Sequence, residues 1–288
     1  MRWSTGNRST IEDRRGWGGG MRVGAPIGCG GVVVLLLLSW VTGTDLLSLL
    51  GPAMEQAAPQ SAPRPGEAVP TTPEEERQVD FVDAVMVDAQ DTWQRLLPDR
   101  YQRTTVVLFR DALQSACGFA QSATGPFYCP SDRKVYLDLG FFDELARRFG
   151  APGDFAQAYV IAHELGHHVQ TVTGIERQVR QAQSGRPDRA NDLSVRMELQ
   201  ADCLAGVWGH AASKPGRFLQ GRVELEPGDV EEGLKAAAAI GDDRLQRMGG
   251  GRVSPENFTH GSSEQRVRWF QRGLQSGSPD ACDTFGGS

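Results

Sequence analysis

The stretch "AYVIAHELGHHVQTVTG", residues 158–174, holds three of the five histidines of this 288-residue chain. Apolar residues surround the histidines and no proline interrupts them, which predicts an α-helix over about residues 154–174. Four residues of a helix advance about 400°, so His163 and His167 project from one face, about one turn apart. His168 points about 100° away from His167. We therefore assign it to the helix surface or to a supporting position behind the pair.

The two aligned histidines bracket Glu164 in the pattern H-E-x-x-H. Two imidazoles on one helix face are the arrangement that two ligands of a tetrahedral zinc ion require. Glu164 follows the first ligand and can reach a metal-bound water without taking a coordination position, which is why this pattern is typical of metalloproteases. The alternative is a helix with incidental histidines.

A catalytic zinc needs a third protein ligand and leaves its fourth position to water. The segment "SVRMELQADCLAGVWGH" predicts a largely buried helix, in which a bare carboxylate needs a partner. We predict Glu198 as the third ligand and Asp202 as the acceptor of an N–H from a ligating histidine, His163 above all. Asp202 itself, and after it His210 or His260, are the alternative ligands.

The N-terminal quarter differs in composition from the rest of the chain. Residues 1–27 are rich in Arg and Gly, and we expect them to be disordered. Residues 28–50 contain "VVVLLLLSW" and would span roughly 34 Å as a helix, enough to cross a bilayer core. Residues 51–73 are rich in proline and predict an extended linker. The folded domain is expected over residues 74–288.

The arginines before the apolar run predict a cytoplasmic N-terminus. We therefore expect a single-pass anchor through residues 28–50 in the inner or plasma membrane, with the domain outside the cytoplasm. A cleaved signal peptide is the alternative, but the long Arg-rich leader and the lack of a clear A-x-A site disfavour it. The net charge of −6 provides no broad basic surface, so we expect no nucleic-acid partner.

Within the folded domain, strand patterns precede most helical ones. "TTVVLF" (104–109) and "KVYLDL" (134–139) predict strands. Residues 117–130 are rich in Gly, Ser and Pro and predict a loop. Besides a helix that begins near Thr72, further helices are expected at about 140–150, 188–213, 229–248 and 263–275. This order predicts an α+β fold with a small sheet packed on a helical core.

Four of the five cysteines lie in the expected folded domain. Outside the cytoplasm, Cys117 can pair with Cys129 across the predicted loop, and Cys203 with Cys282 near the C-terminus. Free buried thiols are the alternative. No C-x-x-C occurs, which argues against a cysteine zinc site.

"HELGHH" followed later by "ELQAD" resembles the gluzincins, the thermolysin-like zinc peptidases with two His and one Glu as ligands. More closely, the chain resembles the bacterial family described as "putative neutral zinc metallopeptidase". The matching segments are "RRGWGGG", "GPFYCPSDRKVYLDLGFFDEL", "AYVIAHELGHHVQ", "RMELQADCLAGVWGH" and "FTHGSSEQRVRWF". The resemblance covers most of the chain from about residue 72. It implies a zincin-like domain after one membrane pass, and a single Zn²⁺ with peptidase activity, but no particular substrate.

By the same resemblance, His260 is the candidate hydrogen-bond donor to the oxyanion; the alternative is an ordinary surface histidine. Arg266 is either a partner of a carboxylate near the site or a solvated charge. We predict peptide hydrolysis by a zinc-activated water with Glu164 as general base. "KVYLDL" is a candidate edge for an extended peptide, with a core strand as the alternative. Two other functions stay open: a membrane-anchored binding or assembly module with a structural zinc, and a zinc hydrolase of non-peptide amides.

Overall fold

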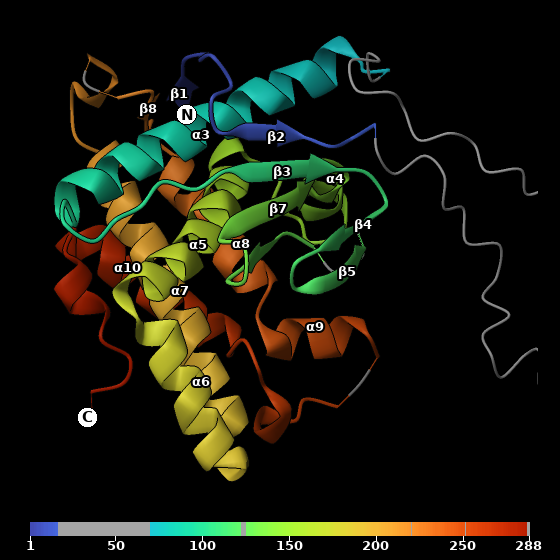
Figure 1. The fold of residues 1–288 in the computed structure, drawn as a ribbon, viewed down its shortest axis with the longest axis vertical. Coiled ribbons are helices and arrows are strands. Elements are labelled where there is room, and N and C mark those ends of the chain that lie inside the picture. The colour runs from blue at the N-terminus through green and yellow to red at the C-terminus, as the bar shows by residue number, and fades with distance from the viewer. Residues whose placement is uncertain (17–69, 122–124, 220, 251, 287–288) are drawn as a thin grey trace, which may run out of the picture. The chain divides into compact units, whose positions relative to one another are not determined.

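A computed structural model describes residues 1–16, 70–121, 125–219, 221–250 and 252–286 of the chain. Met1–Arg14 and Thr71–Ser288 form one folded unit, and Figure 1 shows its helices and its small sheet. The fold is α+β, as predicted. The expected membrane helix, 28–50, lies outside the described residues, as does nearly all of the expected linker. No helix in the described part of the chain is long and apolar enough to cross a membrane.

The main sheet has four strands in the order β2-β3-β7-β6. Their bounds are Ile11–Asp13 for β2, Val106–Phe109 for β3, Lys134–Asp138 for β7 and Phe127–Cys129 for β6. β2, β3 and β7 are parallel, and β6 is antiparallel to β7. Two smaller sheets pair β4 (Ala112–Ser115) with β5 (Gly118–Gln121), and β1 (Arg2–Trp3) with β8 (Val223–Glu224).

Side chains of β3 and β7 alternate between the two faces of the sheet. One set joins the main hydrophobic core with the helices: Val106, Leu108, Val135 and Leu137. The other set, Val107, Phe109 and Tyr136, forms a smaller cluster on the opposite face together with Cys129 of β6. The loop predicted over residues 117–130 is therefore wrong, because β5 and β6 both lie within it and β6 contributes to this second cluster.

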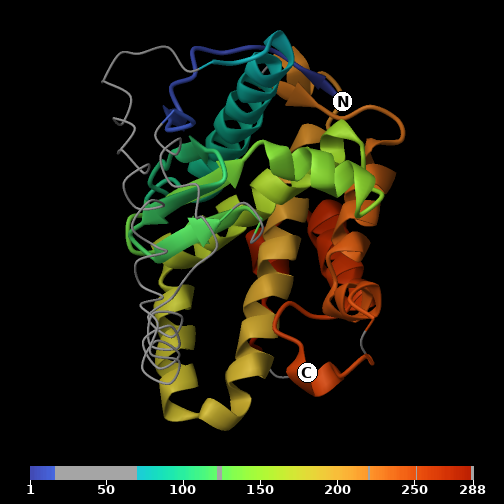
Figure 2. The same cartoon turned by 90° about the vertical axis from the view of Figure 1, so that its right-hand side faces the viewer.

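Two long helices pack against each other in the main core, α3 (Pro73–Leu96) and α5 (Asp154–Thr173). α3 begins as predicted, because the Thr72 hydroxyl accepts a hydrogen bond from the Glu75 N–H at 3.2 Å. The other helices are α4 (Gly140–Arg147), α6 (Ile175–Gly185), α7 (Ala190–Ala212), α8 (Asp229–Ala239), α9 (Asp242–Met248) and α10 (Ser263–Ser276). Figure 2 shows α6 and α7 side by side, joined by a short turn at the lower end.

The predicted disorder of residues 1–27 is wrong for the part that the structure describes, residues 1–16. β1 pairs with β8 and β2 pairs with β3. The folded domain therefore contains residues 1–14 in addition to the predicted 74–288. Composition predicts disorder for a segment that must bury its own surface, whereas this segment folds onto a surface that the later part of the chain provides.

The N-terminal segment makes specific contacts with α3. Trp3 packs edge-on against Phe81, with ring centroids 5.6 Å apart. The backbone N–H groups of Arg8 and Thr10 donate to the carboxylate of Asp83 at 3.0 and 3.2 Å. Asp83 is fully buried, so these donors satisfy a carboxylate that has no access to water.

α7 and α10 approach closely at two glycines. A Cβ added at Gly273 would lie 1.9 Å from the carbonyl oxygen of Cys203, and one added at Gly206 would lie 2.2 Å from that of Phe270. Real side chains do not tolerate such contacts, so the two backbones can pack this tightly only where both positions lack a Cβ. This packing fixes α10 against α7.

We expect Gly273→Ala to destabilise the protein by about 1–3 kcal/mol, because the added methyl forces the two helices apart. Urea unfolding followed by circular dichroism measures the change. Gly185→Ala in α6 is the matched control, since nothing lies within 4 Å of its added Cβ, and alanine there is neutral or stabilising by up to about 1 kcal/mol. Equal effects of the two substitutions would contradict the proposed packing.

Candidate active site

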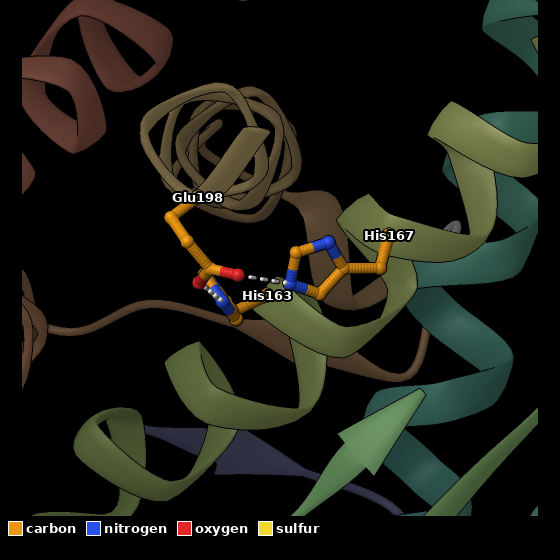
Figure 3. A group of neighbouring side chains, drawn as sticks. All are labelled: His163, His167 and Glu198. Atoms are coloured by element: carbon orange, nitrogen blue, oxygen red, sulfur yellow. Dashed lines mark hydrogen bonds and ion pairs between the residues drawn. The ribbon is translucent and has the colours of Figure 1, made fainter. Parts of the chain in front are cut away.

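The site forms where α5 crosses α7. A Cβ added at Gly166 would lie 2.9 Å from the carbonyl oxygen of Ala201, so the glycine of "HELGHH" lets the two helices approach. This contact brings His163 and His167 of α5 next to Glu198 of α7. Figure 3 shows the Glu198 side chain reaching toward both imidazoles.

The three predicted ligands converge on one point. Glu198 Oε2 lies 3.1 Å from His163 Nε2, and Glu198 Oε1 lies 3.4 Å from His167 Nε2. One donor atom from each residue lies within 4.8 Å of the others. Zinc–nitrogen bonds of about 2.0–2.1 Å place tetrahedral ligands roughly 3.4 Å apart. The identity of these donors and the two distances from Glu198 to the histidines therefore fit Zn²⁺.

Both imidazoles are oriented by acceptors at their other ring nitrogen. His163 Nδ1 lies 2.9 Å from Asp202 Oδ1, and His167 Nδ1 lies 2.8 Å from Gln170 Oε1. With Nδ1–H donating, each Nε2 presents its lone pair to the shared point. Asp202 lies where the sequence predicts it, beside His163. Gln170 was not predicted, although it lies one helical turn after His167.

Asp202 is itself held by two further buried groups. Arg266 donates to it twice, from Nε to Oδ2 at 2.9 Å and from Nη2 to Oδ1 at 2.8 Å. The Tyr159 hydroxyl donates to Oδ1 at 2.5 Å. Burial acts to raise the pKa of Asp202, but the charges of Arg266 and His163 outweigh it and lower the pKa. Arg266 is therefore a partner of a site carboxylate and not a solvated charge.

The carboxylates of Asp202 and Glu198 favour positive charge at the site. Burial acts to lower the pKa of His163, but Asp202 and Glu198 outweigh it and raise the pKa to about 10. Burial acts to raise the pKa of Glu198, but the two histidines lower it well below its usual value. The imidazoles are thus strong proton acceptors when no metal is bound. A divalent cation supplies the same positive charge at the same atoms.

Glu164 lies beside the three donors and is also buried, with 7% of its surface exposed. Burial raises the pKa of its carboxyl, and the neighbouring histidines oppose this rise. A carboxylate with a raised pKa is a better general base than a fully solvated one. The position and the pKa of Glu164 both suit the predicted proton transfer.

The site opens into a cavity of about 870 Å³. His163, Glu164, His167 and Glu198 line it together with apolar side chains that include Phe127, Tyr128, Phe141, Phe149, Val160 and Met197. β6 borders the cavity through Phe127 and Tyr128 and forms one edge of the sheet. "KVYLDL" forms β7, which lies between β3 and β6. It is therefore the core strand of the two alternatives and not the sheet edge.

His168 braces this edge strand against α5. Its Nδ1 accepts from the Tyr128 hydroxyl at 3.0 Å, and its Nε2 donates to the Gln102 carbonyl at 2.5 Å. Only 1% of its surface is exposed, which excludes the helix-surface alternative. His210 Nδ1 lies 2.7 Å from the Leu274 carbonyl on α10, and His210 is not part of the three-residue donor group.

His260 lines the same cavity from the loop before α10. Asp242, the first residue of α9, holds this loop: its Oδ2 accepts the backbone N–H groups of Thr259, His260 and Gly261 at 2.8, 2.6 and 3.0 Å. Its Oδ1 lies 3.2 Å from His260 Nδ1. This hydrogen bond raises the pKa of His260 despite partial burial. Asp242 was missed at the sequence level, because no local pattern pairs it with a loop 18 residues later.

Both predicted cysteine pairs are bonded in the structure, Cys117 to Cys129 and Cys203 to Cys282. The first bridge joins β6 to the turn before β5. The second ties the C-terminal segment to α7, at the residue after Asp202.

The model of a family described as "Putative neutral zinc metallopeptidase" matches residues 1–285. The chain belongs to this family. It is 45% identical over 302 residues to the uncharacterized protein YpfJ of Escherichia coli K12, with the whole of both chains covered. It is 47% identical over 203 residues to the uncharacterized protein Rv2575 of Mycobacterium tuberculosis, covering 69% of this chain and 67% of that protein. No solved structure matches the chain.

We expect Asp202→Asn to weaken zinc binding about 10- to 100-fold, because His163 loses the anion that orients its ring. Competition with a chromophoric chelator measures the affinity. Asp192→Asn on the exposed face of α7 is the matched control, since its ion pairs with Arg189 and Arg196 are solvated. Wild-type affinity in a folded Asp202→Asn protein would show that this carboxylate does not support the ligand.

We expect Asp242→Asn to lower the pKa of His260, because the charged imidazolium loses its acceptor. The histidine ring C–H resonances, followed by NMR as the pH is varied, report this pKa directly. Asp243→Asn on the same helix is the control, since that carboxylate accepts from Ser263 instead. An unchanged His260 pKa would place the imidazole outside the influence of Asp242.

Proposed function

We propose that this protein is a zinc-dependent peptidase that hydrolyses peptide bonds through a metal-activated water. The observation that carries the proposal is the convergence of His163, His167 and Glu198 beside a buried Glu164, at the wall of an open cavity. Bound Zn²⁺ would supply Lewis acidity to the substrate carbonyl and would lower the pKa of its water toward about 7.

Each residue of the site has one role in this proposal. His163, His167 and Glu198 hold the metal, and Asp202 with Arg266 fixes the first of them. Glu164 takes a proton from the attacking water and passes it to the leaving amine. For His260 we propose a hydrogen bond to the developing oxyanion, which its place on the cavity wall supports.

The edge strand β6 is the proposed binding surface for an extended peptide. Its partner β7 occupies one side, while Phe127 and Tyr128 face the cavity that contains the three donors. Backbone pairing with a sheet edge gives affinity without sequence preference, and the neighbouring pockets select side chains. Phe141, Phe149 and Val160 offer an apolar pocket, so we propose a preference for an apolar side chain near the scissile bond.

The proposed hydrolase explains the site better than a purely structural zinc does. Structural zinc sites are closed by four protein ligands, whereas the donor group found in the described residues has three members and borders a cavity. Glu164 is superfluous in a structural site. The same chemistry would hydrolyse a non-peptide amide. A cleavage assay with both kinds of substrate therefore decides the substrate class.

We expect Glu164→Gln to keep about one zinc per chain and to lose cleavage by about 100- to 10,000-fold, because the amide cannot accept the proton. The measurements are metal content by mass spectrometry and the rate of cleavage of a mixed peptide library. Glu176→Gln is the control, since Glu176 lines the same cavity from α6 without joining the donor group. A zinc-loaded Glu164→Gln protein with wild-type rates would refute the mechanism. Cleavage of non-peptide amides but of no peptide would refute the proposed peptidase activity.

A further inference from the structure

The first 14 residues form what we call the N-terminal arm, and the arm begins with a partly buried ion pair. The Met1 amino group lies 3.0 Å from Asp229 Oδ1 and 3.2 Å from Glu226 Oε2. Burial acts to lower the pKa of this amine, but the two carboxylates outweigh it and raise the pKa. Asp229 is itself 5% exposed. These contacts hold the first residue of the arm against the start of α8.

The rest of the arm also makes specific contacts with the folded domain. Arg2 and Trp3 pair with Glu224 and Val223 in an antiparallel ladder. Further along, the Arg8 guanidinium forms ion pairs with Asp80 and Glu76 of α3, and β2 extends the main sheet beside β3.

The domain also depends on the arm. Asp83 of α3 is fully buried, and three of its hydrogen-bond donors are groups of the arm: the Arg8 N–H, the Thr10 N–H and the Thr10 hydroxyl. Without the arm, this carboxylate would lose these three charge-assisted hydrogen bonds. The arm and α3 thus form one cooperative structure.

The folded unit that contains the arm also contains both disulfides. Stable disulfides are typical of oxidising compartments and rare in the cytosol. Cys203 lies on α7, next to Asp202, and both Cys203 and Cys282 are buried. Their bridge belongs to the same folded unit as the arm. The disulfides therefore place the whole unit, and its amino terminus with it, in an oxidising environment.

We infer that the N-terminal arm is retained as a permanent part of the catalytic domain, with the amino terminus on the same, oxidising side of any membrane. The predicted single pass with a cytoplasmic amino terminus conflicts with this inference, since it would separate β1 and β2 from their partner strands. Cleavage of a signal peptide after the apolar run conflicts with it as well, since it would remove the arm from the domain. The inference does not depend on the proposed peptidase activity.

A cross-link between the paired strands tests the inference in the full-length protein in cells. Arg2→Cys combined with Glu224→Cys places two thiols at directly opposed positions, within the reach of a disulfide. After oxidation with copper–phenanthroline, we expect most molecules to contain the linked peptide by mass spectrometry. Arg2→Cys with Ser184→Cys is the control, since α6 and the amino terminus lie at opposite ends in both views. Absence of the link between positions 2 and 224 would overturn the inference.

Labelling of exposed sites gives a second measurement that does not disturb the paired strands. In a Cys29→Ser background, Thr5→Cys in the arm and Ser184→Cys in α6 each add one thiol at an exposed position. A membrane-impermeant maleimide should label both variants in intact cells, or neither until the membrane is opened. Labelling of one and protection of the other would place arm and domain on opposite sides and would overturn the inference.

Discussion

The site depends on the buried ion pair between Asp202 and Arg266. Without the guanidinium, the buried Asp202 would keep hydrogen bonds to Tyr159 and His163 but would lose its counter-charge, a loss that costs several kcal/mol. With it, the carboxylate keeps its charge and orients His163. With both imidazoles neutral, Glu164, Glu198 and Asp202 carry three negative charges against the one positive charge of Arg266. The remaining charge of −2 equals in size the charge of a divalent cation.

Helix packing brings these charges together. Gly166 lets α5 approach α7, and Gly206 with Gly273 lets α10 approach α7 from another side. The histidines, the two α7 carboxylates and Arg266 therefore come from three helices that small residues hold close together. The geometry of the site thus depends on glycines that take no part in its reaction. This is why a methyl group at Gly273 is expected to destabilise the protein.

The sequence predicted those parts of the site that follow helical periodicity. His163, Glu164 and His167 share one turn, and the four-residue spacing of Glu198 and Asp202 placed both carboxylates on one helix face. The roles of Tyr159, Gln170 and Asp242 depend on contacts that no local sequence pattern predicts. The strands β5 and β6 were missed because Gly, Ser and Pro predict a loop. Antiparallel pairing of β5 with β4 and of β6 with β7 outweighs that local preference, and Cys129 of β6 is also buried in the second cluster.

The N-terminal arm was missed for the same physical reason on a larger scale. Its Arg-rich composition was interpreted as a membrane topology signal, but Arg8 finds its counter-charges on α3. Its backbone finds partners in β3 and β8, residues about 100 and 220 positions away. A rule about composition measures what a segment can bury by itself, and the arm buries almost nothing by itself. The stability of such a segment depends on the surface against which it packs. Its structure can therefore be recognised only once the fold of the whole chain is known.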